Sequence, residues 1–134
     1  MKAKDQKLVG SENLKIRRFA GGATRDTDLD KLDYEGFFSP IVLQRYAQYL
    51  HKHRVQSDGQ LRGSDNWQKG ISPQVYMKSH IRHLMSIWLI HRGFEAFDEK
   101  GNKIDLEEAL CADIFNSMGH LYEILMEKVR QERK

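Results

Sequence analysis

The sequence predicts an all-α protein with three main amphipathic helices, an extended N-terminal arm and long loops. Two observations support this prediction. Apolar residues recur at spacings of three and four in three separate segments. Each of these segments also opens with a helix start signal, Ser-Pro twice and Asp once. Because three apolar stripes are few for a self-sufficient bundle, we expect oligomerisation to complete the core.

The first helix is expected from Ser39 to about His53. Ser39 can serve as its N-cap, and Pro40 is tolerated at the first helical position. Its apolar stripe consists of Val42, Leu43, Tyr46, Ala47, Tyr49 and Leu50. Residues 54–71 lose this period and are rich in glycine, which predicts a long loop around Trp67.

The second helix is expected from Ser72-Pro73 to about His91, where Gly93 ends it. Residues 94–104 surround a Lys-Gly-Asn turn and could form a small hairpin. Asp105 then caps the third helix, which has the most regular stripe: Leu106, Ala109, Leu110, Ile114, Met118, Leu121, Tyr122 and Leu125. Its charged tail, residues 126–134, is expected to fray.

The N-terminal part carries no sustained helical period and is punctuated by glycine and aspartate. We expect residues 1–18 to be a flexible basic arm and residues 19–134 to be a single helical domain. Leu14, Ile16 and Phe19 could dock on the body as a short strand.

The composition is that of a globular protein, with 40% hydrophobic and 31% charged residues. No apolar stretch approaches the roughly 20 residues that span a bilayer, and no apolar signal core is visible near Met1. We therefore expect a cytoplasmic protein without a membrane partner. The single Cys111 is expected to be a small buried hydrophobe. With 22 basic and 19 acidic residues, the charge balance supports a nucleic-acid partner only weakly.

Two loop segments combine residue types that suit a nucleotide. In the glycine-containing segment 21–34, Arg25 and Lys31 could pair with phosphate, although a simple turn is the commoner role. In Asn66-Trp67-Gln68-Lys69-Gly70, a purine could stack on Trp67 with Lys69 near its phosphates. The alternative is that Trp67 anchors the loop on the core, and both roles can hold at once.

The second and third helices carry polar side chains on shared faces. His80 and His83 are three residues apart, as two metal ligands on a helix would be, but no third ligand stands at a fixed spacing. On the third helix, a ridge of Asp113, Asn116, His120 and Glu123 could hold Mg²⁺ if it faced a cavity. Solvated outer faces are the ordinary explanation for both patterns.

Several short motifs occur together in one order: Gly22–Asp26, Lys31–Tyr34, Ser39-Pro40, Asn66–Gly70, Ser79–Leu84 and a late helical Asn116. In this order they resemble the dATP/dGTP diphosphohydrolase N-terminal-domain family of phages and prophages, over about residues 19–125. That family is itself similar to MazG-like all-α pyrophosphohydrolases. The resemblance implies a helical oligomer, in the host cytoplasm if phage-encoded, that binds a purine deoxynucleotide with Mg²⁺ or Mn²⁺. It also implies cleavage of the triphosphate to monophosphate and pyrophosphate.

Two sets of residues are the site candidates, and the second consists of carboxylates that stand near the places where the chain departs from the family. The nucleotide-binding candidates are Arg25, Asp26, Lys31, Asn66, Trp67, Lys69, Arg82, His83, Arg92 and Asn116. The metal-ligand candidates are Asp98, Glu107, Glu108 and Asp113, of which Glu107 and Glu108 are also the catalytic candidates. This chain departs from the family pattern in two places. It has His91-Arg92-Gly93 where members commonly end the second helix in Gly-Glu followed by Asp, and Ala109 and Ala112 where two histidines commonly precede the late Asn.

Three hypotheses follow. The first is a divergent metal-dependent purine deoxynucleoside triphosphate pyrophosphohydrolase. The second is a non-catalytic nucleotide-binding or regulatory module on the same scaffold, which the missing Gly-Glu favours. The third is a phage accessory protein that binds nucleic acid or a host protein through its basic ends. The first two require that Arg25, Lys69, Arg82 and the acidic start of the last helix converge on one pocket.

Overall fold

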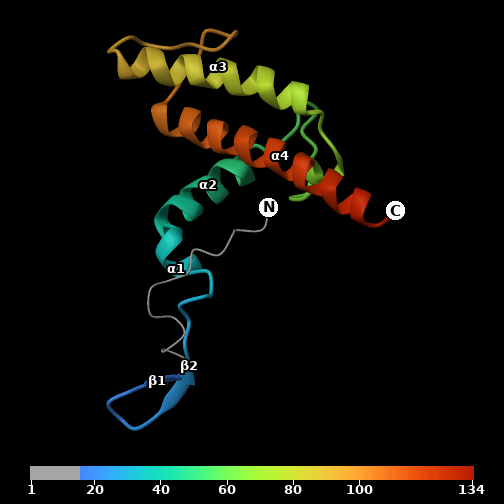
Figure 1. The fold of residues 1–134 in the computed structure, drawn as a ribbon. Coiled ribbons are helices and arrows are strands. Elements are labelled where there is room, and N and C mark those ends of the chain that lie inside the picture. Colours follow the sequence, from blue (N-terminus) through green and yellow to red (C-terminus); the bar gives the residue numbers. More distant parts are fainter. Residues whose placement is uncertain (1–15) are drawn as a thin grey trace. The chain divides into compact units, whose positions relative to one another are not determined.

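The computed structural model describes residues 16–134, in which helices predominate (Figure 1). This part of the chain contains four α-helices, one 3-10 helix and a two-stranded sheet. The predicted all-α character is therefore confirmed in outline, with the small sheet as an addition. The chain forms two compact units that divide after Ser39, and each is described by itself. The domain boundary expected between residues 18 and 19 stays a prediction.

The first unit contains a β-hairpin and a short helix. Strand β1 (Ile16–Arg18) pairs antiparallel with β2 (Thr24–Asp26). A short strand around Ile16 was expected, but its partner is β2, and the expected docking on the body stays a prediction. Gly22, with φ 89°, takes the left-handed conformation that the turn between them requires. Helix α1 (Tyr34–Phe37) follows and was not predicted from the sequence. Leu14 and most of the predicted basic arm lie outside the described residues.

The second unit contains the three expected helices: α2 (Pro40–Lys52), α3 (Pro73–His91) and α4 (Leu106–Glu132). Two of the predicted caps are confirmed, because the side chain of Ser72 accepts a hydrogen bond from the Gln74 amide and that of Asp105 from the Glu108 amide. The cap expected at Ser39 stays a prediction. The expectation that the charged tail frays is wrong, since α4 continues to Glu132. Oppositely charged side chains one turn apart, Glu127 and Arg130 at 3.3 Å, favour helix there.

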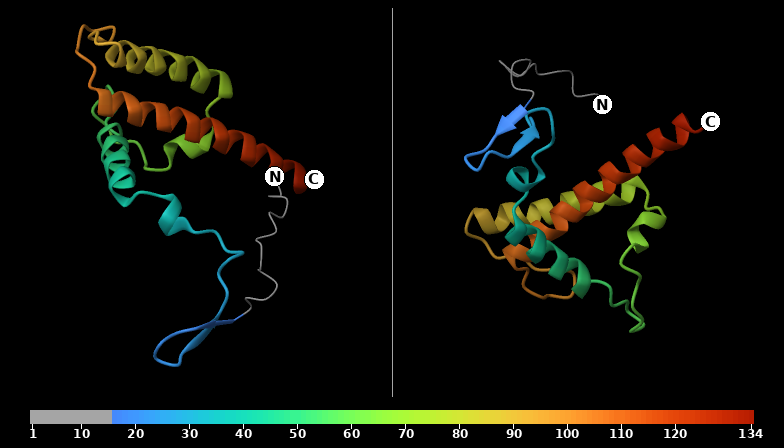
Figure 2. Two further views of the ribbon diagram at one scale, coloured as in Figure 1. Left: turned by 60° about the vertical axis from the view of Figure 1, so that its left-hand side comes forward. Right: turned by 90° about the horizontal axis from the view of Figure 1, so that it is seen from below.

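Helices α3 and α4 lie side by side and run in opposite directions, and α2 contacts α4 from another side (Figures 1 and 2). The buried residues of α4 are small, namely Ala109, Cys111, Ala112, Asn116 and Gly119. Small side chains let the backbones of neighbouring helices approach closely. Cys111 is 5% exposed, which confirms its predicted burial.

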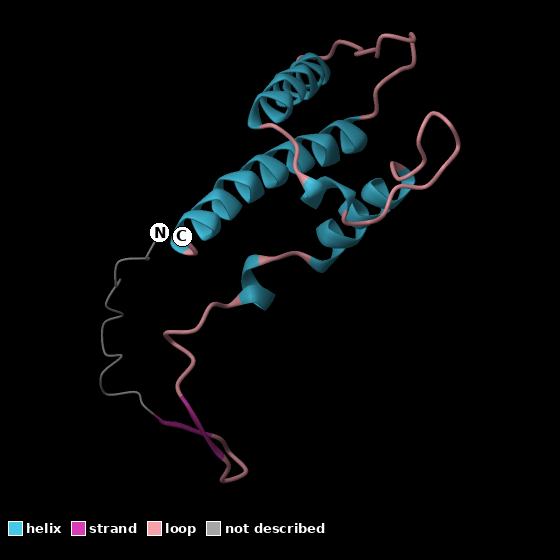
Figure 3. Cartoon of the chain, turned by 90° about the vertical axis from the view of Figure 1, so that its right-hand side faces the viewer, coloured by secondary structure: helices cyan, strands magenta, loops and turns pink. Residues whose placement is uncertain are grey.

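Two connections carry short pieces of structure (Figure 3). The loop between α2 and α3 returns through a bridge between Val55 and Leu61 and then forms the 3-10 helix η2 (Asn66–Lys69). The suggested hairpin between α3 and α4 is present as an antiparallel bridge between Phe97 and Lys103. None of the helices in residues 16–134 has the length and apolarity needed to cross a membrane.

Many large apolar side chains of the second unit remain exposed. On α3, five of them form an outer ridge at spacings of three and four, with exposed fractions between 44% and 54%: Met77, Ile81, Leu84, Met85 and Trp88. On α4 they include Leu110, Ile114, Leu121, Ile124 and Leu125. The second unit therefore buries only part of its predicted stripes.

Candidate functional site

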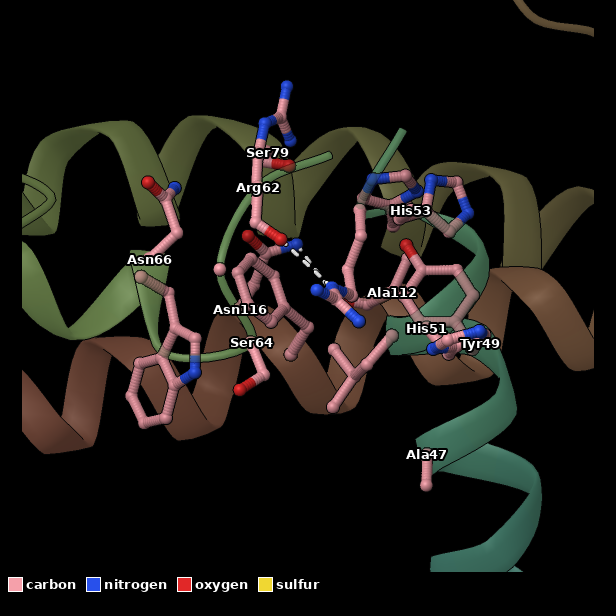
Figure 4. Close-up of a pocket in the computed structure, with 16 residues that line it drawn as sticks. Ala47, Tyr49, His51, His53, Arg62, Ser64, Asn66, Ser79, Ala112 and Asn116 are labelled. Carbon is pink, nitrogen blue, oxygen red and sulfur yellow. Dashed lines mark hydrogen bonds between the residues drawn. The ribbon is translucent and has the colours of Figure 1, made fainter. Parts of the chain in front are cut away.

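A pocket of about 500 Å³ lies within the second unit, where the end of α2, the following loop, α3 and α4 meet (Figure 4). Its lining comes from all four segments: Ala47, Tyr49, Leu50, His51, His53, Arg54, Arg62, Gly63, Ser64, Asn66, Trp67, Ser79, His83, Ala112, Phe115 and Asn116. Residues from the first and last thirds of this unit thus share one cavity.

One end of the pocket is aromatic and amide-rich. Trp67 is half-buried and packs edge-on against Tyr122 of α4, with 4.8 Å between the ring centroids. It therefore both anchors the loop and lines the pocket, as the two readings of the sequence allowed. Asn116 is 4% exposed, and its Nδ2 donates to the Ala112 carbonyl at 3.0 Å. This bond holds the plane of an amide that faces the pocket.

The other end is cationic. Figure 4 shows His51 and His53 beside Tyr49, on the side of the pocket away from Asn66. Arg54 and Arg62 join them through the loop, where the Arg54 Nε and the Arg62 amide each donate to the other residue's carbonyl at 2.8 Å. Among the described residues that line the pocket, none is an aspartate or glutamate. The lining therefore favours an anionic ligand.

Two of the pocket histidines, His53 and His83, have a pKa below the usual value. Burial lowers the pKa of the His53 imidazole, and the opposing effect of Glu108 is smaller. Burial, and then the neighbouring Arg82, lowers the pKa of His83 against the opposing charges of Asp113 and Glu99. Both imidazoles are therefore mainly neutral near pH 7 in the free protein.

Each of the predicted metal ligands lies against groups of the protein itself. Glu107 accepts a hydrogen bond from the Arg45 Nε at 2.9 Å, and Glu108 accepts one from the Lys52 Nζ at 2.7 Å. Asp113 lies 3.0 Å from His80 Nδ1. Asp98 accepts two backbone amides of its own turn at 2.9 Å, those of Lys100 and Asn102, which lower the pKa of its carboxyl.

These four carboxylates do not form one ligand set. Within residues 16–134, no group of three or more His, Cys, Asp or Glu side chains is placed to hold a metal ion. A shared Mg²⁺ or Mn²⁺ site therefore does not fit the arrangement as it stands, and no chemical step is derived through such an ion.

The predicted nucleotide-binding residues do not all share one site. Asn66, Trp67, His83 and Asn116 line the pocket together. Lys69 and Arg82 are exposed and do not line it, and neither do Glu107 and Glu108. The expected convergence of these cations and the acidic start of α4 on one pocket is therefore not found within the second unit. Arg92 borders a separate apolar hollow with Met85, Trp88, Leu89 and Phe94. Arg25, Asp26 and Lys31 line a cavity of the first unit with Arg17 and Asp28.

Sequence reasoning missed the cationic end of the pocket. His51, His53, Arg54 and Arg62 were not among its candidates, although three of the four stand within four residues of each other. Arg62 joins them only because the chain reverses through the Val55–Leu61 bridge. The cluster of basic residues after Leu50 was the one signal that pointed there.

Comparisons with protein-family models, curated proteins and solved structures found no match to this chain. The function is therefore argued from the residues of the site.

Proposed function

We propose that the chain binds a purine deoxynucleoside triphosphate in the pocket of the second unit. The observation behind this proposal is that one cavity joins an aromatic ring and two amides to a set of arginines and histidines, with no carboxylate in its described lining. A purine can stack on Trp67, while carboxamides such as those of Asn66 and Asn116 pair with base edges. Arginines pair with phosphate oxygens in a forked geometry. The volume is within the usual range for small-molecule sites.

Titration with dGTP and dATP, followed by tryptophan fluorescence, tests this proposal. Trp88 lies outside the pocket, so the Trp88→Phe variant isolates the signal of Trp67. Saturable quenching in Trp88→Phe, and a rise in unfolding temperature with ligand, are the expected results. Asn116→Ala should weaken binding by about tenfold or more, because a buried amide that reads the base is lost. Asn102→Ala, exposed before α4 and outside the pocket lining, is the matched control and should bind normally. Absence of both quenching and stabilisation at millimolar nucleotide would reject the proposal.

A pyrophosphohydrolase activity is the second candidate, and Glu108 is the residue that favours it. The Glu108 Oε2 is buried without a hydrogen-bond partner among the described residues, 3.8 Å from the Nε2 of the pocket residue His53. Pyrophosphate release from a panel of deoxynucleoside triphosphates with Mg²⁺ or Mn²⁺ tests this activity. Loss of release in Glu108→Gln, but not in Lys103→Gln, supports it. Nucleotide binding without release favours the non-catalytic module, for which the missing Gly-Glu also speaks.

We propose in addition that the chain associates with itself through its exposed apolar stripes. Large apolar side chains stay uncovered both on the ridge of α3 (Met77, Ile81, Leu84, Met85 and Trp88) and on α4. Contiguous exposed apolar surface commonly marks a site of association between proteins. The alternative of a nucleic-acid partner gains no further support: the basic residues before residue 16 lie outside the described residues, and Arg130 near the other end is paired with Glu127.

A further inference from the structure

We propose that the cationic end of the pocket, formed by His51, His53 and His83 beside Arg54 and Arg62, is a phosphate subsite that takes up protons as it fills. This inference rests on the proposed nucleotide binding and adds which end holds the phosphates and how pH regulates it. The cluster draws on three segments: α2 supplies His51, the loop after it supplies His53 and both arginines, and α3 supplies His83.

The position of His53 would let a bound phosphate change the charge of its imidazole. Its ring packs on Tyr49, with 4.3 Å between ring centroids. The charges acting on it are Lys52 and Arg62, which disfavour protonation, and Glu108, which favours it from 3.8 Å. Glu108 is itself occupied by Lys52 at 2.7 Å and lies 3.8 Å from Arg45, so its charge is largely neutralised. Because of this, a ligand anion would be the main new charge that favours the protonated ring.

His83 stands in a similar balance on α3. Arg82 and His53 disfavour its protonation, and Asp113 and Glu99 favour it. Asp113 is already 3.0 Å from the Nδ1 of His80. An incoming phosphate would again supply the missing negative charge, since an opposite charge at about 4–6 Å raises the pKa of an imidazole.

The arginines and histidines then have different roles. Arg54 and Arg62 are always charged and give the subsite its basal attraction for anions. The imidazoles of His53 and His83 are mainly neutral until phosphate binds, so binding draws protons from solution. By linkage, affinity rises as pH falls through the pKa values of the bound state, and it levels off below those of the free state. A triphosphate is the ligand class that fits, because its charge is spread over several oxygens.

Calorimetric titration of the full chain with dGTP, near pH 7.5 in two buffers of different ionisation enthalpy, measures the protons taken up. We expect uptake of a substantial fraction of a proton, up to about two, and affinity that rises about three- to tenfold between about pH 8 and about pH 6.5. Cation binding would make a nucleotide phosphate lose protons, so uptake cannot come from the ligand. The double variant His53→Gln and His83→Gln should bind more weakly at the lower pH and take up no protons. His91→Gln, exposed at the end of α3 and outside the pocket lining, should behave as the native chain.

Deoxyguanosine and tripolyphosphate serve as the two partial ligands. Binding of tripolyphosphate with proton uptake supports the phosphate subsite. If dGTP then binds no more tightly than tripolyphosphate, only the purine part of the proposed function is rejected. Binding of dGTP without proton uptake, or with the same uptake in the folded double variant, overturns the subsite and leaves nucleotide binding intact. Failure of both dGTP and tripolyphosphate to bind at any pH overturns both. Circular dichroism shows whether the double variant is folded. If the double variant is unfolded, the proton uptake of the native chain decides whether the subsite takes up protons.

Discussion

Tyr76 of α3 packs its ring onto the backbone of α4 at Gly119, at a point where any Cβ on α4 would collide with the ring. Tyr76 is 2% exposed, and its ring also meets Phe115 edge-on with 5.9 Å between centroids. The approach of α3 to α4 beside the pocket therefore depends on the missing side chain at residue 119.

Replacement of Gly119 by alanine should destabilise the protein by about 1–3 kcal/mol, because the added methyl group overpacks this contact. The midpoint of urea unfolding measures the effect. Ser117→Ala, exposed on the same helix, is the control and should change stability by less than about 0.5 kcal/mol. A Gly119→Ala variant as stable as the native chain, or more so, would show that the two helices are not in contact here. Alanine is the better helix former, so only the collision predicts a loss.

Removal of the Tyr76 hydroxyl should cost little or even stabilise the fold. The Oη of Tyr76 is buried and has no hydrogen-bond partner among the described residues. A buried hydroxyl without a partner carries a desolvation cost that phenylalanine does not. Tyr76→Phe should therefore unfold at the same urea concentration as the native chain or at a higher one. Loss of more than about 1 kcal/mol would instead reveal a partner for this hydroxyl, such as a buried water.

Glu108 should make the stability of the protein depend on pH in the acid range. The hydrogen bond from Lys52 is the main cause that lowers the pKa of this carboxyl, and the charges of Lys52, Arg45 and His53 add to it. A carboxyl with a lowered pKa in the folded state contributes stability above its unfolded pKa of about 4.3 and loses it as pH falls further.

The Glu108→Gln variant should therefore be less stable than the native chain at neutral pH, with a difference that shrinks below about pH 4. Thermal unfolding across this range measures the difference. Glu107→Gln is the matched control, because its carboxyl is 70% exposed and its pair with Arg45 should contribute less. A pH-independent difference between Glu108→Gln and the native chain would contradict this role.

Self-association should depend on the outer ridge of α3. Leu84, which is 44% exposed at the middle of the ridge, is the residue to change. Leu84→Lys should shift the sedimentation of the protein toward the monomer while leaving its circular dichroism unchanged, because a charge cannot be buried without a partner. Gln131→Lys, exposed near the end of α4, adds the same charge elsewhere and should leave the assembly intact. A native chain that sediments as a monomer at micromolar concentration would remove the proposal.

Local signals predicted the helices of the second unit well. Ser72 and Asp105 act as caps through bonds to amides two and three residues ahead, which depend on nearby residues alone. Helix α1 was missed because four residues carry too little periodicity to be recognised. The end of α4 was misjudged because its charged residues were taken as a frayed tail, although pairs one turn apart stabilise a helix.

The same local reasoning from the sequence predicted only part of the candidate site. Asn66, Trp67, His83 and Asn116 were selected by residue type and motif, and they share one pocket. Glu107 and Glu108 were selected as metal ligands, but they bond to Arg45 and Lys52, which stand 62 and 56 residues earlier in the chain. No spacing along a helix encodes such partners.

The sequence by itself determined where the helices of the second unit start, which residues form their apolar stripes and which loop carries Trp67, because caps and periodicity act within a few residues. Only the tertiary structure decided that the acidic start of α4 faces α2 and that the reversal at Val55 and Leu61 brings Arg62 to the histidines. The reason is that ion pairs and cavities form between segments whose separation is set by packing, and α3 and α4 can pack closely only because residues such as Gly119 leave space between them.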